Sequence, residues 1–533
     1  MKRERLYLFD TTLRDGQQTP GVDFSLDDKL TVMEMLDGLG LDYIEGGYPG
    51  ANPTDTALFA EDRSLQASFT AFGMVKRPGR SASNGPGLQD LLRAKAKAIC
   101  FVAKSWDYHV RVALETTNEE NLLAIRESIA NAKALGREVL LDCEHFFDGF
   151  KANPDYALQV AKTAYDAGAR WVVLCDTNGG TLPQEVSDIA RRVTKTVPGD
   201  HLGIHAHNDT EQAVANSLAA VLAGVRQIQG TLNGIGERCG NANLVSIIPT
   251  LVLKKEFADR FETGVSQERL GTLTHVSRAF DELLNRSPNG QAPYVGRSAF
   301  ATKAGIHASA IVKEPETYEH VPPDSVGNRR RMLVSDQAGK SNLLAELARI
   351  GLKVDKSDTR LDALLREVKE REAQGYAYDG ADASFEILAR RMLGTVPHYF
   401  DVLSFRVIVE HRHNALGALV TMSEAVVKVQ VDDEVFINAG EGNGPVNALD
   451  VALRKDLGKF QRFIDDLELA DYKVRILNGG TGATTRVLVE SRDGKGNRWF
   501  TVGVSPNIVD ASFQALLDSI LFKLLREQVS LTA

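Results

Sequence analysis

The sequence has no apolar run long enough to cross a membrane. None of its 533 residues lie in a stretch approaching the roughly 20 consecutive apolar residues that a transmembrane helix requires. The N-terminus, MKRERLYLFD, carries charges but no apolar core of the kind that marks a secretory signal. We therefore expect a protein that has no membrane association and resides in the cytoplasm.

A surplus of positive charge is also absent. The chain has 62 lysine and arginine residues against 71 aspartate and glutamate residues, and its net charge is −9. Surfaces that bind nucleic acid are normally basic, so we expect no nucleic-acid partner. An acidic protein can still hold a small anion where positive side chains gather in a local pocket.

Cysteine is scarce, with only four residues in the chain. No two of them form a C-x-x-C pair, and each lies in or near an apolar run. This placement favours buried thiols over disulfides or a zinc cluster. The four residues are Cys100, Cys143, Cys175 and Cys239.

The first 250 residues contain eight short apolar runs that alternate with amphipathic segments. The runs begin at Leu6, Asp42, Phe69, Ala98, Glu138, Trp171, Leu202 and Gln227. One segment between them, SLDDKLTVMEMLDGLG, has Ser25 as a candidate N-cap and Gly40 as a candidate C-cap of a helix. Nearly continuous apolar strands that alternate with helices indicate a parallel sheet covered by helices. Eight units favour an α/β protein with a closed (β/α)₈ TIM barrel over the alternative, a doubly wound open sheet.

This alternation stops after about residue 275, and two further regions follow. We expect a barrel over residues 1–280, a linker region with a helical pair over residues 281–396, and a strand-rich α+β domain over residues 397–533. The last region contains an internal repeat, in which Gly440 aligns with Gly503 and Ala448 aligns with Ala511. The repeat predicts two similar units, each ending in a glycine turn and a helix.

Reactive side chains gather where the predicted barrel strands end. The strands run into the sequences DTTLRDG, DCEH, DTNGG, HAHND and NGIGERCGN. The carboxyl ends of barrel strands form the catalytic face of such enzymes. Turn formation explains the glycines and asparagines in these sequences, but it explains Arg14, Glu144, His205 and His207 poorly.

Two histidines and one aspartate form a candidate metal site. His205 and His207 are two residues apart on a predicted strand, so their rings project from the same face. Asp15 follows the first strand, and only the eighth strand separates the first from the seventh. Two imidazoles and a carboxylate suit Mn²⁺, Mg²⁺, Co²⁺ or Zn²⁺ and leave positions open for a substrate. For an isolated H-x-H, two hydrogen-bonded histidines without a metal are an equally good interpretation.

These motifs together resemble those of the 2-isopropylmalate, homocitrate and citramalate synthases. The resemblance rests on FDTTLRDGQQTPG from Phe9, HAHND from His205, NGIGERCGNANL from Asn233, AGIHASA from Ala304 and the duplicated C-terminal region. Relatives commonly carry Glu where Gln17 stands and Ala where Gly47 stands, and both departures favour the citramalate type.

The resemblance implies a metal-dependent condensation of acetyl-CoA with a 2-oxo acid. Pyruvate is the favoured acid, which would make citramalate for isoleucine biosynthesis. The alternatives are a 2-isopropylmalate synthase that uses 2-oxoisovalerate and, less favoured, a metal-dependent lyase with the same barrel. The resemblance also implies a homodimer whose C-terminal domain senses an amino acid, for which isoleucine is the expected effector.

The resemblance further implies roles for individual side chains. Arg14 would bind the substrate and stabilise the developing alkoxide, although a salt bridge at the barrel mouth is the simpler alternative. Thr177 would hydrogen-bond the substrate carboxylate, and Asn241 would support the metal through water. The predicted proton-transfer residues are Glu144 and His307, with Tyr318 orienting a group or a water molecule.

Overall fold

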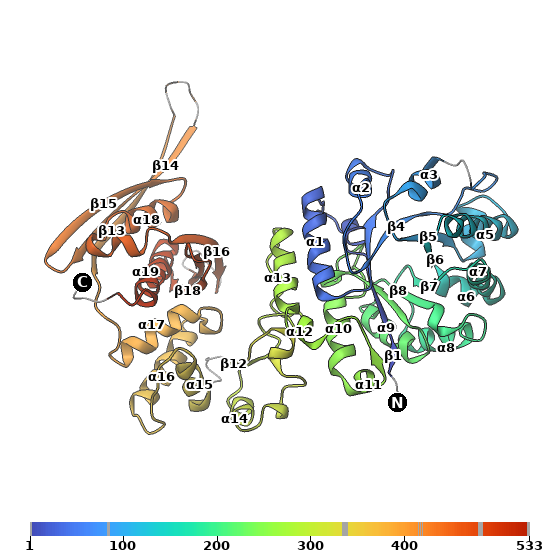
Figure 1. Cartoon of the computed structure of the whole chain (residues 1–533). Helices are drawn as coiled ribbons and strands as arrows, with labels where there is room; N and C mark the ends of the chain where they lie inside the picture. The colour runs from blue at the N-terminus through green and yellow to red at the C-terminus, as the bar shows by residue number, and fades with distance from the viewer. Residues whose placement is uncertain are drawn as a thin grey trace. The chain divides into compact units, whose positions relative to one another are not determined.

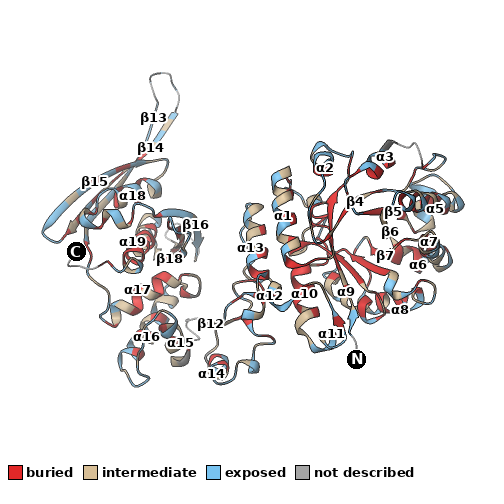
Figure 2. Ribbon diagram, viewed as in Figure 1, coloured by how far each residue is buried: buried red, intermediate tan, exposed pale blue. Residues whose placement is uncertain are grey.

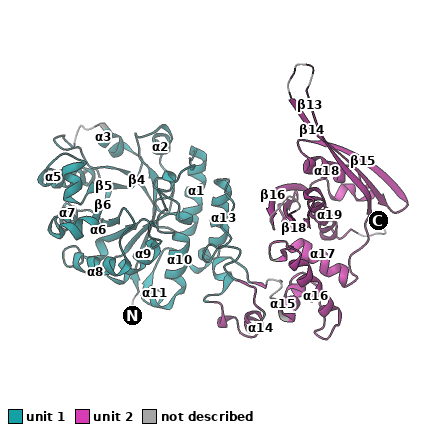
Figure 3. Ribbon diagram, turned by 180° about the vertical axis from the view of Figure 1, so that it is seen from behind, with its two compact units in different colours: residues 1–300, 320–330 teal, residues 301–319, 331–533 magenta. Residues whose placement is uncertain are grey.

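The chain folds into two compact units, shown in different colours in Figure 3. The computed structural model describes residues 3–82, 86–332, 339–413, 415, 417, 419–477 and 483–529. The first unit comprises residues 1–300 and 320–330, and the second comprises residues 301–319 and 331–533. The domain boundaries at residues 280 and 396 stay predictions. Within the described residues, no helix is both long and apolar enough to cross a membrane.

The first unit is a closed barrel of eight parallel strands, and this excludes the open sheet. The first barrel strand, β2, pairs with its neighbour β3 and with the last barrel strand, β9, and these pairings close the ring. Figure 1 shows the barrel, with strands β4 to β8 labelled, surrounded by helices. All eight predicted runs form the strands β2 (Tyr7–Asp10), β3 (Tyr43–Gly47), β4 (Ser68–Met74), β5 (Ala98–Lys104), β6 (Glu138–Glu144), β7 (Trp171–Asp176), β8 (Leu202–Ala206) and β9 (Gln227–Gly230).

Helices cover the outside of this barrel, and the first of them, α1 (Leu26–Leu39), has both predicted caps. The Ser25 hydroxyl accepts a hydrogen bond from the backbone N–H of Asp28, and Gly40 ends the helix with φ at 89°. The further helices are α2 (Pro53–Leu58), α3 (Pro86–Arg93), α4 (Asp107–Val112), α5 (Asn118–Ala134), α6 (Phe146–Ala152), α7 (Pro154–Asp166), α8 (Pro183–Val193), α9 (Ala213–Leu222) and α10 (Leu244–Leu253).

A smaller set of elements completes the first unit after α10. A short parallel pair joins the chain's first strand to this region, and three short helices accompany it. These elements are β1 (Glu4–Arg5), β10 (Phe261–Glu262), α11 (Lys255–Ala258), α12 (Gln267–Leu270) and α13 (Leu273–Leu283).

The barrel strands are buried along most of their length, as the red ribbons of Figure 2 show. One apolar cluster inside the barrel includes Phe9, Tyr43 and Trp171. Cys100, Cys143 and Cys175 are buried as predicted, but the prediction was wrong for Cys239, which is exposed. Cys239 lies in the polar loop after β9, where no apolar strand covers it.

A buried lysine fixes the loop that follows β2. Lys29, on α1, donates hydrogen bonds from Nζ to the carbonyl oxygens of Leu13 and Gly46, each at 2.9 Å, and pairs with Asp55 at 2.5 Å. A buried ammonium is stable only when its protons are paired in this way. Because Leu13 directly precedes Arg14, Lys29 holds the candidate site loop against the end of β3.

The second unit begins with a helical region. Its elements are β11 (Ala301–Thr302), α14 (Gly305–Lys313), β12 (Arg331–Met332), α15 (Lys340–Arg349), α16 (Arg360–Ala373) and α17 (Asp382–Met392). The last three helices share an apolar cluster that includes Leu347, Leu364 and Phe385. Helices α16 and α17 are the helical pair that the sequence predicts.

Two similar sheets with one helix each form the rest of the second unit. The antiparallel orders are β13-β14-β15 and β16-β17-β18. Their bounds are β13 (Asp401–His413), β14 (Leu419–Val431), β15 (Glu434–Gly442), α18 (Pro445–Arg454), β16 (Glu468–Ile476), β17 (Thr485–Arg492), β18 (Arg498–Ser505) and α19 (Ile508–Arg526).

The prediction of glycine turns in this repeat was wrong. Gly440 lies within β15 and Gly503 within β18. A Cβ atom on Gly440 would lie 2.8 Å from the carbonyl oxygen of Ala448, and one on Gly503 would lie 1.9 Å from that of Ala511. The two glycines therefore allow a helix backbone to pack directly against a strand.

Candidate metal centre and active site

The structure brings Asp15, His205 and His207 together at the carboxyl ends of the barrel strands. Asp15 Oδ2 lies 3.1 Å from His205 Nε2 and 3.8 Å from His207 Nε2, and the two Nε2 atoms are 3.3 Å apart. All three residues are buried, and their ligand atoms lie within 4.8 Å of one another. Strand β9 alone separates β2, which leads to Asp15, from β8, which carries His205.

The chemistry of this cluster fits a divalent cation. Burial opposes ionisation of Asp15, but the positive charge of Arg14 and the contact with His205 outweigh it and hold the Asp15 pKa well below its usual range. Burial and the neighbouring His205 lower the pKa of His207 to about 4, so its ring is neutral near pH 7. An ionised carboxylate and a neutral imidazole are the forms that bind metals.

Asn241 lies beside the three candidate ligands. Its Nδ2 donates to Asp15 Oδ2 at 2.7 Å and lies 3.2 Å from His205 Nε2. Its Oδ1 is buried without a hydrogen-bond partner among the described residues. The Nδ2 side of the amide thus faces the candidate ligands, and the Oδ1 side packs against Gly236.

Arg14 is held in place by three neighbours. Its Nε donates to Glu45 Oε2 at 2.7 Å, its guanidinium lies 4.0 Å from the centre of the Phe72 ring, and its Nη1 is 3.8 Å from Asp15 Oδ1. The salt bridge considered as the alternative role of Arg14 therefore exists, with Glu45 as the partner, and the guanidinium lies beside Asp15. Burial would lower the Arg14 pKa, but Glu45 and Asp15 raise it, and the side chain stays charged.

Glu144 and Thr177 lie at the ends of neighbouring strands. Glu144 Oε2 pairs with Lys104 Nζ at 2.5 Å, and its side chain is partly exposed. The Thr177 hydroxyl accepts a hydrogen bond from the backbone N–H of His145 at 2.7 Å. A threonine hydroxyl also carries a proton of its own, so Thr177 can donate to a second group.

His307 and Tyr318 belong to the second unit. His307 lies on α14, and its ring centre is 4.3 Å from that of Tyr318. His307 is exposed, and 51% of Tyr318 is exposed. The two side chains that the sequence singles out in this region thus form one aromatic pair.

Three buried polar residues of the site were missed by the sequence reasoning. Glu45 on β3 holds Arg14, Gln229 on β9 accepts a hydrogen bond from His205, and Asp142 on β6 accepts one from Gln229. Burial, opposed by Arg14 and reinforced by Asp142, raises the pKa of Glu45 to about 7. The available signal was a polar residue within a predicted barrel strand.

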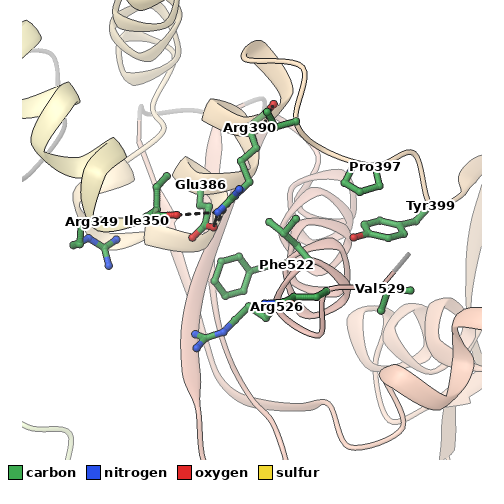
Figure 4. Close-up of a pocket in the computed structure, with 12 residues that line it drawn as sticks. Arg349, Ile350, Glu386, Arg390, Pro397, Tyr399, Phe522, Arg526 and Val529 are labelled. Carbon is green, nitrogen blue, oxygen red and sulfur yellow. Dashed lines mark hydrogen bonds and ion pairs between the residues drawn. The ribbon is translucent and has the colours of Figure 1, made fainter. Parts of the chain in front are cut away.

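A separate cavity of about 620 Å³ lies within the second unit (Figure 4). Its arginines already have acidic partners, since Arg390 pairs with Glu386 at 2.7 Å and Arg349 pairs with Glu346 at 2.6 Å. None of the predicted site residues line it.

Family comparisons agree with this arrangement of the chain. A family model described as HMGL-like matches residues 5–276, and one described as the homocitrate synthase post-HMGL domain matches residues 294–375. A third, the LeuA allosteric (dimerisation) domain, matches residues 379–523. These matches and the buried ligand cluster define a class of metal-dependent enzymes with an HMGL-like barrel and a LeuA-type domain.

Curated relatives narrow this class. The chain is 49% identical to an (R)-citramalate synthase of Aquifex aeolicus, covering 98% of this chain and 99% of the relative. It is 50% identical to an (R)-citramalate synthase of Geobacter sulfurreducens, covering 97% of each. A 2-isopropylmalate synthase of Methylorubrum populi is more distant, at 31% identity over 97% of this chain and 95% of the relative. The chain belongs to the (R)-citramalate synthase family and is a transferase of the acetyl-CoA-dependent acyltransferase type.

Proposed function

We propose that this protein condenses acetyl-CoA with pyruvate to form (R)-citramalate and CoA, as a cytoplasmic step of isoleucine biosynthesis. A base removes a proton from the acetyl methyl group, and the resulting enolate carbon bonds to the keto carbon of pyruvate. The keto oxygen takes up a proton, and water hydrolyses the thioester and releases the CoA thiol. The near full-length identity to (R)-citramalate synthases supports pyruvate over 2-oxoisovalerate.

The single observation that carries the proposal is the position of Arg14 beside the Asp15, His205 and His207 cluster. A divalent ion bound there, Mn²⁺, Mg²⁺, Co²⁺ or Zn²⁺, would polarise the keto group as a Lewis acid. Arg14 adds a fixed positive charge at the same place, so an alkoxide that forms there is stabilised without any movement of the guanidinium. Asn241 supports this shell from the Asp15 side.

The 2-oxo acid also needs a partner for its carboxylate. Thr177 is our candidate, because the hydrogen bond from His145 fixes its oxygen and leaves its proton to donate. Arg14 contributes to the same recognition through its positive charge. A binding site defined by so few polar groups discriminates between 2-oxo acids mainly by the size of the space for the group beyond the ketone.

For proton transfer we propose that Glu144 and His307 act together and that Tyr318 orients one of them or a water molecule. Lys104 pairs with Glu144 and keeps a positive charge beside that carboxylate. The Tyr318 ring lies against the His307 ring, with the ring centres 4.3 Å apart. His307→Ala should then lower kcat by about 10²–10⁴-fold, the usual contribution of a positioned acid or base.

This role of His307 is tested by steady-state kinetics of the purified full chain. His398→Ala is a matched control, because His398 is another exposed histidine of the second unit and pairs with Asp401. Full condensation activity in His307→Ala would remove His307 from the mechanism.

A thiol-release assay with acetyl-CoA tests the substrate. With pyruvate, 2-oxoisovalerate and 2-oxoglutarate in parallel, we expect the highest kcat/KM for pyruvate, by at least about tenfold, because one or more misplaced carbon groups cost 1–3 kcal/mol in a fitted pocket. A preference for 2-oxoisovalerate would favour a 2-isopropylmalate synthase. Cleavage of citramalyl-CoA to acetyl-CoA and pyruvate, with no net condensation, would favour a lyase.

The LeuA-type domain supports two further proposals, a homodimer and feedback control by isoleucine. The two sheets with their helices, β13–β15 with α18 and β16–β18 with α19, are the elements that would bind the effector. The same thiol-release assay with isoleucine or leucine added distinguishes the two amino acids. Inhibition by leucine alone would contradict the proposed position in isoleucine biosynthesis.

A further inference from the structure

One ring nitrogen of His205 faces the candidate cation site, and the other faces a buried amide. His205 on β8 and Gln229 on β9 are register partners in adjacent parallel strands. His205 Nδ1 lies 2.8 Å from Gln229 Oε1, and Gln229 is completely buried. An amide oxygen can only accept a hydrogen bond, so Nδ1 must carry the proton. The lone pair of a neutral His205 ring then lies on Nε2, the atom nearest Asp15.

A third residue fixes which way this amide points. Gln229 Nε2 donates to Asp142 Oδ1 at 3.0 Å, and Asp142 is also buried. If the Gln229 amide were turned over, its oxygen would face the Asp142 carboxylate, and that contact would be repulsive. Asp142 therefore selects the orientation in which the amide oxygen accepts from His205.

The second histidine has no comparable support. His207 Nδ1 is buried and has no hydrogen-bond partner among the residues that the structure describes. Hydrogen bonds to the outer nitrogen fix the orientation of a ligating imidazole and make it more basic. Of the two imidazoles, His205 is therefore the preorganised one.

We propose that Gln229 is a positioning residue that holds His205 in the Nδ1–H tautomer and that Asp142 orients the Gln229 amide. The chain Asp142–Gln229–His205 thus sets the affinity of the site for its divalent cation. This inference rests on the proposed function, because it assumes that His205 ligates a cation. Beyond that function, we infer that residues on three barrel strands, β6, β9 and β8, together determine the affinity for the cation.

The test is the affinity of the purified full chain for Mn²⁺, measured by electron paramagnetic resonance of the free ion. Gln229→Leu should weaken Mn²⁺ binding by about 10–100-fold, the usual effect of losing such a supporting hydrogen bond. Gln227→Leu is the matched control. Gln227 lies two residues earlier on β9 and is fully buried, and its amide has no hydrogen-bond partner in the described part of the chain. We expect its affinity to stay within about twofold of the unmutated chain.

A charge-exchanged double variant provides a second test. In Gln229→Glu with Asp142→Asn, the new carboxylate can accept from His205 Nδ1 and from the new amide, so the hydrogen-bonded chain is rebuilt. We expect Mn²⁺ affinity close to that of the unmutated chain. Melting temperatures without added metal show whether each variant folds. If Gln229→Leu does not fold, the Mn²⁺ affinity of the double variant tests the positioning role.

The possible results distinguish a failure of the proposed metal-dependent function from a failure of the positioning role of Gln229. If the unmutated chain does not bind Mn²⁺, the proposed metal-dependent function fails. If it binds Mn²⁺ and Gln229→Leu binds equally well, the positioning role is wrong. The role is also wrong if the double variant folds but binds as weakly as Gln229→Leu, or if Gln227→Leu loses as much affinity.

Discussion

Asp15→Asn is expected to abolish tight cation binding and to lower kcat/KM for the condensation by about 10³-fold or more. The substitution keeps the shape of the side chain but removes the anionic ligand among two imidazoles. Lewis-acid polarisation contributes several kcal/mol to such reactions, and about 4 kcal/mol corresponds to a factor of about 10³. The measurements are metal content after dialysis, a Mn²⁺ titration and steady-state kinetics.

Asp23→Asn is the control for this variant. Asp23 is exposed, and its contact is a hydrogen bond from Gln17 rather than one with the candidate ligands. The same chemical change should leave both metal content and kcat/KM unaltered there. If Asp15→Asn retained its metal and its activity, Asp15 would not be a ligand and the proposed site would have to be abandoned.

Arg14→Lys is expected to retain the cation but to lower kcat by about 10²–10³-fold. A lysine keeps the positive charge, but it cannot donate to Glu45, stack on Phe72 and remain beside Asp15 at the same time. Loss of one preorganised donor to a developing oxyanion typically costs a factor of this size. Steady-state kinetics with saturating Mn²⁺ separate this effect from a loss of metal.

Arg170→Lys is the matched control for Arg14→Lys. Arg170 also stacks on an aromatic ring, with its guanidinium carbon 3.7 Å from the centre of the Trp171 ring. It directly precedes β7, so it lies at the amino end of the barrel, away from the candidate site. We expect a small loss of stability and an unchanged kcat. Equal losses of kcat in the two variants would mean that Arg14 has only a structural role.

The barrel could be predicted from the sequence because each of its strands is buried on both faces. Such strands are continuous apolar runs, and eight of them are visible in the sequence without reference to any partner. The approach of Asp15 to His205 and His207 followed from strand order alone, because residues at the ends of nearby strands meet at one face of the barrel.

The residues that support this cluster could not be predicted in the same way. Glu45, Asp142 and Gln229 are buried polar residues within barrel strands, and each has a hydrogen-bond partner that is distant in the sequence. A sequence read along the chain does not show which buried polar groups face one another across a barrel. The roles of His307 and Tyr318 stay predictions for a related reason, since these residues and Glu144 belong to different units of the chain.

The glycines of the C-terminal repeat illustrate a different limit. The two glycines of the repeat were interpreted as turns, yet Gly440 and Gly503 lie in strands where a helix passes too close for a side chain. The conformational preferences of neighbouring residues do not reveal that a helix backbone packs against these glycines. Such a close approach involves two separate elements of the structure.

The position of the three candidate ligands has a consequence for the folding of the barrel. The ring closes where its first strand, β2, meets its last strand, β9, and Asp15 and His205 lie on opposite sides of that junction. A cation bound there would link the two ends of the barrel sheet. On a nascent chain, Asp15 leaves the ribosome long before His205. The two residues can therefore bind one cation only after almost the whole barrel has been synthesised. The cation would then bind only to a barrel whose strands are nearly all in place.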